Sequence, residues 1–254
     1  MYEDKYLKEE KDSVVNYITH HYKMELKDLP AFNDYLNIAI KNIISLKIWS
    51  NYLKKSGAIP SGPMYYFDEI ASNLNQILIL GIVGYRIPSY IMLRRSQENY
   101  LMFLYYLDHP IEFYKKEENV INRDFLKLKS LKEYVLEYPF DAKYEVDDHL
   151  SSTYKKLIRK VIESWSNQYT VLSNFVHGSS KDYFDLKSYL EDINPNNEIL
   201  ISLKKELEIL GSILNTTNIM FFLEIYNEFE EREKSLIRLS ISDEDFKKDL
   251  SHIW

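Results

Sequence analysis

The chain has 254 residues, of which 45% are hydrophobic and 28% are charged, and it contains no cysteine. A chain of this length and composition can bury a sizeable core, so we expect a globular protein with one large domain. The missing cysteines exclude a disulfide framework and thiolate metal sites. A net charge of −7 argues against generic nucleic-acid binding, which depends on lysine and arginine side chains that neutralise phosphates.

The longest apolar stretch, ILILGIVGYRIPSYIML at residues 77–93, is interrupted by Arg86 and Pro88. A membrane-spanning helix needs about 20 consecutive apolar residues, so we interpret this stretch as buried core and expect no membrane contact. The first residues, MYEDKYLKEEKD, are charged where a signal peptide would have an apolar segment. We therefore expect a cytoplasmic location.

Apolar residues recur at the helical period along nearly the whole chain, and only 6 glycines and 7 prolines interrupt it. Alternating strand patterns are absent from the sequence, which argues against a sheet-based cofactor fold. The predicted class is all-α: a single domain over 1–254, built as a helical bundle of about five core helices. We place the core at about 65–230, with an N-terminal helical extension over 1–57 and a C-terminal helical tail over 233–254.

Proline and glycine mark the helix ends in the first half of the chain. Pro30 separates two helices, and Gly57 is a plausible left-handed cap before the loop 57–63. Pro88 should break or kink the chain, because proline has no amide proton for the hydrogen bond one turn back. The helices expected here span 4–22, 31–55, 64–85 and 89–107.

Capping residues mark the helix ends in the second half. Asp147 or Asp148 can cap a long helix, which Gly178 is well placed to end. Ser242 and Asp245 have the spacing of a capping box and predict a short helix that ends near 254. The other elements expected here are helices at 111–118 and 123–137, a turn at 139–141, a turn at 194–197 and the longest helix, at about 198–232.

Two basic stretches could form a local face for an anionic partner. Each is also typical of the solvated side of an amphipathic helix, which is the simpler interpretation. Their members are Lys155, Lys156, Arg159 and Lys160 in YKKLIRK, and Arg123, Lys127, Lys129 and Lys132 further upstream.

Several motifs of common enzymes are absent from the sequence. There is no glycine-rich phosphate loop, no nucleophile elbow and no pair of histidines at helical metal-ligand spacing. His20 and His21 are adjacent, so they point to different sides of their helix. We predict neither a cofactor nor a metal site.

The stretch LRRSQENYLMFLYYLDHP at 93–110 predicts a central helix that is apolar nearly all round. Buried charge is costly unless it is paired, and Glu98 lies about one helical turn from both Arg94 and Arg95. Tyr105 continues the stripe of Arg94 and Glu98. The charges therefore form either an ion-pair network that fixes helix register or a site in which an arginine is held ready for an anion.

The second candidate stretch is LSNFVHGSS at 172–180. Thr170, Ser173 and His177 share one face of the preceding helix with Ser166. Ser173 lies one turn before His177 and could hydrogen-bond its ring and fix its tautomer. The alternative is a structural histidine that the dipole stabilises at a helix C-terminus. We take Ser173, Thr170 and Tyr105 as candidate substrate-binding residues.

The combination of LRRSQEN with LSNFVHGSS in an all-helical chain resembles HEPN-like helical bundles, a superfamily rich in bacterial toxins and phage-defence proteins. The resemblance covers roughly 65–230. Active members carry an arginine, four to six residues and then a histidine, and their dimer forms a metal-independent ribonuclease site. The resemblance places the histidine at His177, and it implies a homo-oligomer that acts on RNA.

The arginine of this motif does not map, because the corresponding positions are occupied by Thr170, Val171 and Leu172. Either Arg94 or Arg95 supplies the charge from a neighbouring helix, or the chain is a non-cleaving relative. The alternative function is a non-catalytic helical module that binds a partner protein or a small ligand.

A metal-independent ribonuclease needs a base near the ribose 2′-hydroxyl and a cation near the phosphate. The predicted catalytic set is therefore His177, Arg94, Arg95 and Glu98, with Glu98 orienting an arginine. If the chain acts on RNA, His177 and one of these arginines should lie within a water-bridged hydrogen bond of a common point. The aromatic content of 15% also favours a homo-oligomer, because tyrosine is enriched at interfaces.

Overall fold

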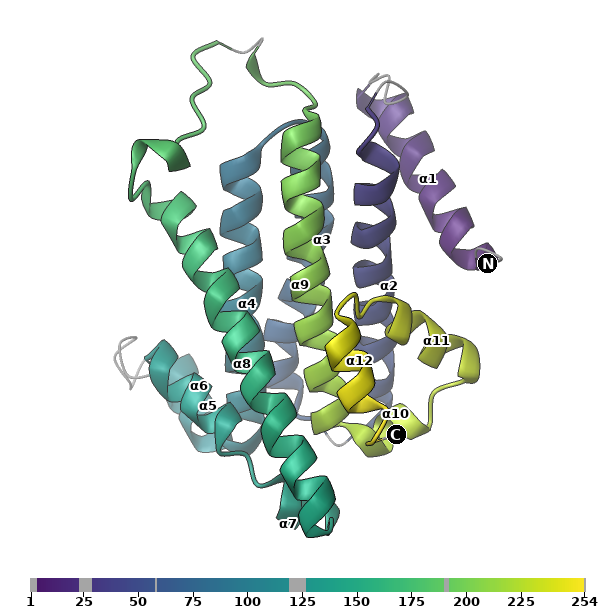
Figure 1. Cartoon of the computed structure of the whole chain (residues 1–254), viewed down its shortest axis with the longest axis vertical. Helices are drawn as coiled ribbons and strands as arrows, with labels where there is room; N and C mark the ends of the chain where they lie inside the picture. The colour runs from purple at the N-terminus through teal and green to yellow at the C-terminus, as the bar shows by residue number, and fades with distance from the viewer. Residues whose placement is uncertain (1–3, 23–28, 58, 119–126, 190–191, 254) are drawn as a thin grey trace.

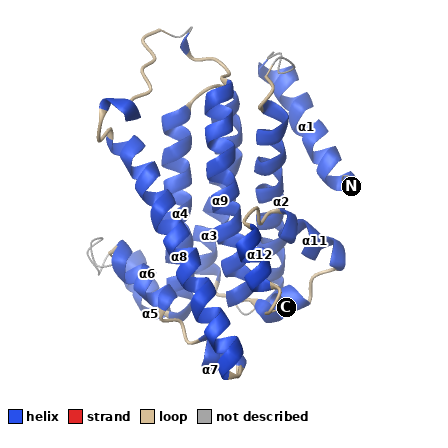
Figure 2. Ribbon diagram, viewed as in Figure 1, coloured by secondary structure: helices blue, strands red, loops and turns tan. Residues whose placement is uncertain are grey.

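The computed structural model describes residues 4–22, 29–57, 59–118, 127–189 and 192–253. This part of the chain folds into helices and contains no strand, as Figure 2 shows, so the predicted all-α class is confirmed. Five long helices form the bundle (Figure 1): α2 (Phe32–Ser56), α3 (Ser61–Ile82), α4 (Arg86–Asp108), α8 (Asp148–His177) and α9 (Asn197–Phe221).

Shorter helices surround the long ones. The helix α1 (Lys5–Tyr22) packs beside α2, and α8 crosses the bundle obliquely while contacting both α4 and α9 (Figure 1). The other α-helices lie at or alongside the half of the bundle away from the α8–α9 loop: α5 (Pro110–Glu117), α6 (Leu128–Leu136), α7 (Phe140–Tyr144), α10 (Leu223–Asn227), α11 (Glu231–Leu239) and α12 (Glu244–Leu250). A short 3-10 helix, Lys181–Tyr183, lies in the α8–α9 loop itself.

The helix α2 lies inside the core, which differs from the N-terminal extension expected over 1–57. Tyr35, Trp49 and Leu53 on this helix are fully buried. Polar side chains also tie it to α9, because Asn42 Nδ2 donates to the carbonyl oxygen of Leu207 at 2.7 Å. The core therefore begins at α2 and not at residue 65.

Both ends of α8 are capped as the sequence predicts. At the start, Asp147 Oδ1 accepts a hydrogen bond from the Leu150 amide at 2.8 Å. At the end, Gly178 adopts φ 55°, and the amides of Gly178 and Ser179 donate to the carbonyl oxygens of Phe175 and Asn174. This pair of hydrogen bonds is the Schellman pattern that a left-handed glycine allows. It ends α8 at His177 and so fixes the position of the His177 backbone.

Pro88 does not kink the chain. It lies in the first turn of α4, where the amide that proline lacks would have no helical partner. The break between α3 and α4 comes at Gly84, which has φ 91°. A Cβ atom there would approach the carbonyl oxygen of Asn194 to 2.0 Å, so both backbone conformation and space require glycine.

The helix expected over 198–232 is divided in two. The backbone leaves helical geometry at Phe222, with φ −130° and ψ 40°, so α9 ends at Phe221 and α10 follows. The longest described helix is instead α8, with 30 residues. Phe222 packs near the rings of Trp49 and Phe103, which accounts for the break through tertiary contacts.

Three further boundaries differ from the expectation. The helix α3 begins at Ser61, inside the expected loop 57–63, and α7 occupies the expected turn at 139–141. The helix α12 is capped by Asp243, whose Oδ1 accepts from the Phe246 amide at 3.0 Å, while the Ser242 amide donates to Ser212. Of the helix expected over 123–137, residues 123–126 lie outside the described part of the chain.

A chain of buried amide and carboxyl groups joins α4, α8 and α9. Gln97 Nε2 donates to Gln168 Oε1 at 2.7 Å. Gln168 Nε2 in turn donates to the carbonyl oxygen of Glu206 at 2.7 Å and to its Oε2 at 2.8 Å. Burial raises the pKa of the Glu206 carboxyl despite these hydrogen bonds. Hydrogen bonds between buried groups need defined geometry, so this series of hydrogen bonds fixes how α8 lies against α4.

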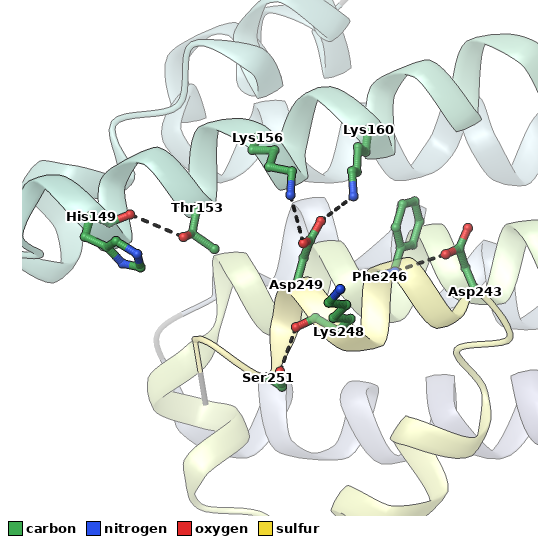
Figure 3. Close-up of polar contacts among 9 residues, drawn as sticks. All are labelled: His149, Thr153, Lys156, Lys160, Asp243, Phe246, Lys248, Asp249 and Ser251. Carbon is green, nitrogen blue, oxygen red and sulfur yellow. Dashed lines mark hydrogen bonds and ion pairs between the residues drawn. The ribbon is translucent and has the colours of Figure 1, made fainter.

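The YKKLIRK stretch is largely engaged in ion pairs within the protein. Lys156 and Lys160 on α8 both contact Asp249 on α12, at 3.2 and 2.5 Å, as Figure 3 shows. Lys155 contacts Asp141 at 2.7 Å. In the other basic stretch, Arg123 lies outside the described residues. These ion pairs favour the structural interpretation of YKKLIRK.

The Asp249→Asn substitution should destabilise the protein by about 1–2 kcal/mol, because it removes both ion pairs that hold α12 on α8. Burial acts to raise the pKa of Asp249, but the hydrogen bonds from Lys160 and Lys156 outweigh it and hold this pKa below its ordinary value. A lowered carboxyl pKa stabilises the fold at neutral pH, and this contribution is lost as the pH falls below about 4. Urea unfolding at pH 7 and pH 3 measures both effects, and an equal difference between wild type and variant at the two pH values would contradict the assignment.

Candidate functional site

A cluster of polar side chains joins α4 to the C-terminal half of α8. Arg94 and Glu98 lie one turn apart on α4, and Tyr169 and His177 lie two turns apart on α8. The two helices pack directly against each other. Glu98 directly follows Gln97, and Tyr169 directly follows Gln168, and these two glutamines share a buried hydrogen bond. The packing of α4 against α8 in the core therefore also sets the position of this cluster.

The guanidinium of Arg94 is the centre of the cluster. Its Nε donates to Glu98 Oε1 and to the Tyr169 hydroxyl, each at 3.0 Å. The Tyr169 hydroxyl donates to the same Glu98 oxygen at 2.7 Å. These hydrogen bonds close a triangle that holds one edge of the guanidinium.

The other edge of the guanidinium contacts His177. Arg94 Nη1 lies 2.9 Å from His177 Nε2. Arginine has donors and no acceptor, so Nε2 must accept this hydrogen bond, and the neutral imidazole then carries its proton on Nδ1. Arg94 therefore sets the tautomer of His177, a role for which Ser173 was the predicted candidate.

Tyr169 is held by stacking as well as by hydrogen bonds. Its ring stacks on buried Trp165 with centroids 4.8 Å apart and an interplanar angle of 10°, and Arg94 Cζ lies 4.9 Å from the Tyr169 centroid. Burial, followed by the hydrogen bond to Glu98, raises the pKa of Tyr169. The hydroxyl thus stays protonated at neutral pH and remains a donor to Glu98.

The cluster is open to solvent on the His177 side. His177 is exposed, and the side chains of Arg94 and Glu98 are 22% and 38% exposed. The helix α4, which was predicted to be central and apolar nearly all round, is therefore partly open to solvent where it carries these charges. A ligand in solution can therefore reach the imidazole, while the Arg94 side chain beside it is partly exposed.

Arg95 lies outside the cluster. Its guanidinium forms an ion pair with Glu69 on α3, and Asn99 Nδ2 donates to the other oxygen of this carboxylate at 2.8 Å. Of the two candidate arginines, Arg94 alone contacts His177. Arg94 and His177 thus lie within direct hydrogen-bond distance of each other, and Arg95 is paired with a different helix.

The residues expected to bind substrate lie apart from this geometry. Ser173 Oγ is buried without a hydrogen-bond partner, so its predicted bond to His177 is wrong. Thr170 Oγ1 donates to the carbonyl oxygen of Ser166 at 2.9 Å within its own helix. Tyr105 stacks on His109 at 3.8 Å and belongs to another aromatic group. Tyr169 was not among the predicted site residues, although its position two turns before His177 on the same helix could have indicated it.

A separate cavity of about 280 Å³ lies near the C-terminal ends of α4 and α9. Its lining includes Asp108, Tyr134, Tyr138, Lys143 and Phe222. Much of the Lys143 residue is exposed, but its ammonium group donates to the Phe221 carbonyl oxygen at 2.7 Å and lies over three rings. Burial of this group lowers the pKa of Lys143. No residue of this cavity was among the predicted site residues.

Among the described residues, no group of three or more histidine, cysteine, aspartate or glutamate side chains is placed to hold a metal ion. None of the described helices combines the length and apolar character needed to cross a membrane. Comparison of the chain with protein-family models, with curated proteins and with solved structures finds no match.

The Arg94→Ala and Arg95→Ala substitutions should differ in their effect on stability. Arg94→Ala removes hydrogen bonds to Glu98, Tyr169 and His177 and should cost about 1–3 kcal/mol. Arg95→Ala breaks a more exposed ion pair and should cost less than about 1 kcal/mol. Chemical unfolding of both variants measures the difference, and equal costs would show that the triangle around Arg94 adds no stability.

Proposed function

We propose that this chain is a metal-independent ribonuclease of the HEPN-like type, with His177 as the general base and Arg94 as the phosphate ligand. The observation that carries the proposal is the direct contact of Arg94 Nη1 with His177 Nε2 at a solvent-exposed position. This contact places a base and a permanent cation close enough to act on the same ribose–phosphate unit, as metal-independent RNA cleavage requires. The arginine comes from α4, whereas the family's motif carries it on the same stretch as the histidine.

In this mechanism the substrate first takes the place of His177 on Arg94 Nη1, which frees the Nε2 lone pair from the hydrogen bond that it accepts in the free protein. The ribose 2′-hydroxyl then gives its proton to His177 Nε2, and the 2′-oxygen attacks the adjacent phosphorus. The bond from phosphorus to the 5′-oxygen breaks, and that oxygen takes up a proton, which protonated His177 can return. Arg94 stabilises the charge that develops on the phosphate oxygens. Glu98 and Tyr169 position the arginine by holding its Nε edge, so the Nη edge faces the substrate.

The His177→Ala variant should lose RNA cleavage by about 100-fold or more, the usual contribution of a general base. Its thermal midpoint should change little, because the side chain is exposed at a helix end. Wild type and variant are incubated with total RNA and with tRNA in the presence of a chelator, and cleavage is followed on gels. His149→Ala is the matched control, since His149 is exposed in the first turn of the same helix and should leave cleavage unchanged.

Equal cleavage by wild type and His177→Ala, or cleavage that disappears with the chelator, would contradict this mechanism. The proposal of a toxin or phage-defence role rests on the resemblance to HEPN-like bundles. Expression of the wild type in bacteria should then arrest growth, and the His177→Ala variant should relieve the arrest.

The proposed enzyme is a homodimer or a higher oligomer. In support of this proposal, the segment that follows His177 exposes large apolar side chains: Phe184 at 55%, Leu186 at 81% and Tyr189 at 73%. Several large apolar side chains this exposed in one segment are typical of an interaction surface. Size-exclusion chromatography with light scattering measures the mass, and a monomer at micromolar concentration would rule the oligomer out.

The alternative proposal is a non-catalytic module that binds a small ligand or a partner protein. The cavity at Lys143 favours it, because aromatic rings with a few polar groups are typical of small-molecule sites. Absence of RNA cleavage with every substrate, together with ligand-dependent stabilisation that Tyr138→Ala abolishes, would favour this function over the ribonuclease.

A further inference from the structure

The contact between Arg94 and His177 leaves part of the arginine available. Arginine has five N–H donors. Among the described residues, its Nε serves Glu98 and Tyr169, and Nη1 serves His177. No described side chain accepts a hydrogen bond from Nη2. Nη2 therefore keeps donors of the kind that bind phosphate and sulfate groups.

His177 responds to protonation in a way that this contact makes definite. While the ring is neutral, Nε2 is an acceptor and holds Arg94 Nη1 at 2.9 Å. Once the ring is protonated, both of its nitrogens are donors, so the bond to Arg94 is lost and two cations face each other. Protonation of His177 without a bound anion is thus unfavourable, because it places two cations in contact. Binding of an oxyanion without protonation is also unfavourable, because the anion would face the lone pair of Nε2.

We propose that the contact between Arg94 and His177 opens to bind a tetrahedral oxyanion, which replaces the direct hydrogen bond between Nη1 and Nε2 and is taken up together with one proton on His177. The oxyanion accepts from the guanidinium on one side and from the imidazolium on the other. This proposal rests on the residues of the proposed ribonuclease, and it specifies the ligand state that they favour. The anion-bound site with protonated His177 resembles the stage of the proposed reaction at which His177 has already taken the proton of the 2′-hydroxyl.

The insertion requires the His177 ring to move away from Arg94, since the two groups are in direct contact. The triangle of Arg94, Glu98 and Tyr169 fixes the guanidinium from behind, so the imidazole is the group that moves. His177 is exposed and is followed by Gly178, so its ring can turn toward solvent. The dipole of α8 also favours a cation at this end of the helix.

The charges near the site come from both helices. On α4 they are Arg94 and Glu98, and on α8 the titratable partner is Tyr169, which remains protonated. The ion pair of Arg95 with Glu69 lies toward α3. Glu98 is already bound to the Nε edge of Arg94, so a ligand oxyanion does not compete with it for the outer edge.

Sulfate is the probe of choice, because its charge does not change over the range in which a histidine titrates. Calorimetric titrations with sodium sulfate are run from about pH 5.5 to about pH 8.5 at constant ionic strength. The expected result is an affinity that falls about tenfold per pH unit once free His177 is neutral, as uptake of one proton requires. Titrations in buffers of different ionisation enthalpy should give an uptake that approaches one proton per sulfate.

Variants separate the two arms of the site. His177→Gln should bind sulfate more weakly and without this pH dependence, because the glutamine amide does not titrate. Arg94→Gln should abolish binding, and Arg95→Gln, which removes the same charge one residue away, should bind as the wild type does. If Arg94→Gln does not fold, the pH dependence of the wild type and of His177→Gln still decides the question.

Sulfate affinity that is constant with pH, that is equal in wild type and His177→Gln, or that is undetectable at every pH would overturn the oxyanion site. Nuclear magnetic resonance of ¹⁵N-labelled histidines gives a direct readout, since sulfate should convert the His177 signal from the Nδ1–H form to the imidazolium. The test needs no RNA. A protein that binds sulfate in this way and leaves RNA intact keeps the oxyanion site and loses the ribonuclease proposal.

Discussion

The placement of α8 on α4 depends on the buried hydrogen bond between Gln97 and Gln168, which continues to Glu206 on α9. Apolar packing tolerates small rotations and slips of a helix, whereas buried amide groups are costly when their partners are misplaced. These buried hydrogen bonds therefore favour the observed register of α8 over one shifted along α4 or α9. Glu98 and Tyr169 follow Gln97 and Gln168 directly, so the register of the core also determines which side chains meet at the surface.

The surface cluster shows how this order in the core becomes chemistry. Arg94 lies between a carboxylate and a hydroxyl on one side and an imidazole on the other. A guanidinium held along one edge loses little further freedom when it binds a ligand along the opposite edge. The arrangement thus combines a fixed cation with a titratable group that is free to move.

Local sequence signals predicted the features that depend on local backbone chemistry. The helix α8 begins after Asp147 and ends before Gly178 as predicted, because a side-chain cap and a left-handed glycine act within one turn. The break at Phe222 has no such signal, since it arises from packing against α2 and α4. Neighbouring residues on a helix point about 100° apart, so the choice between Arg94 and Arg95 depended on the rotation of α4 against α3 and α8. The burial of Ser173 depended on the same rotation, which no single-helix pattern encodes.

The close approach of Gly84 to Asn194 ties the turn between α3 and α4 to the segment that connects α8 with α9. Positive φ and a backbone oxygen in the place of a Cβ atom leave no other amino acid at this position. Surface residues of distant descendants can change freely, but a descendant that keeps this fold must keep a glycine here. We therefore expect glycine to be invariant at position 84 among relatives that keep this fold, so this position can anchor the alignment of a strongly diverged relative.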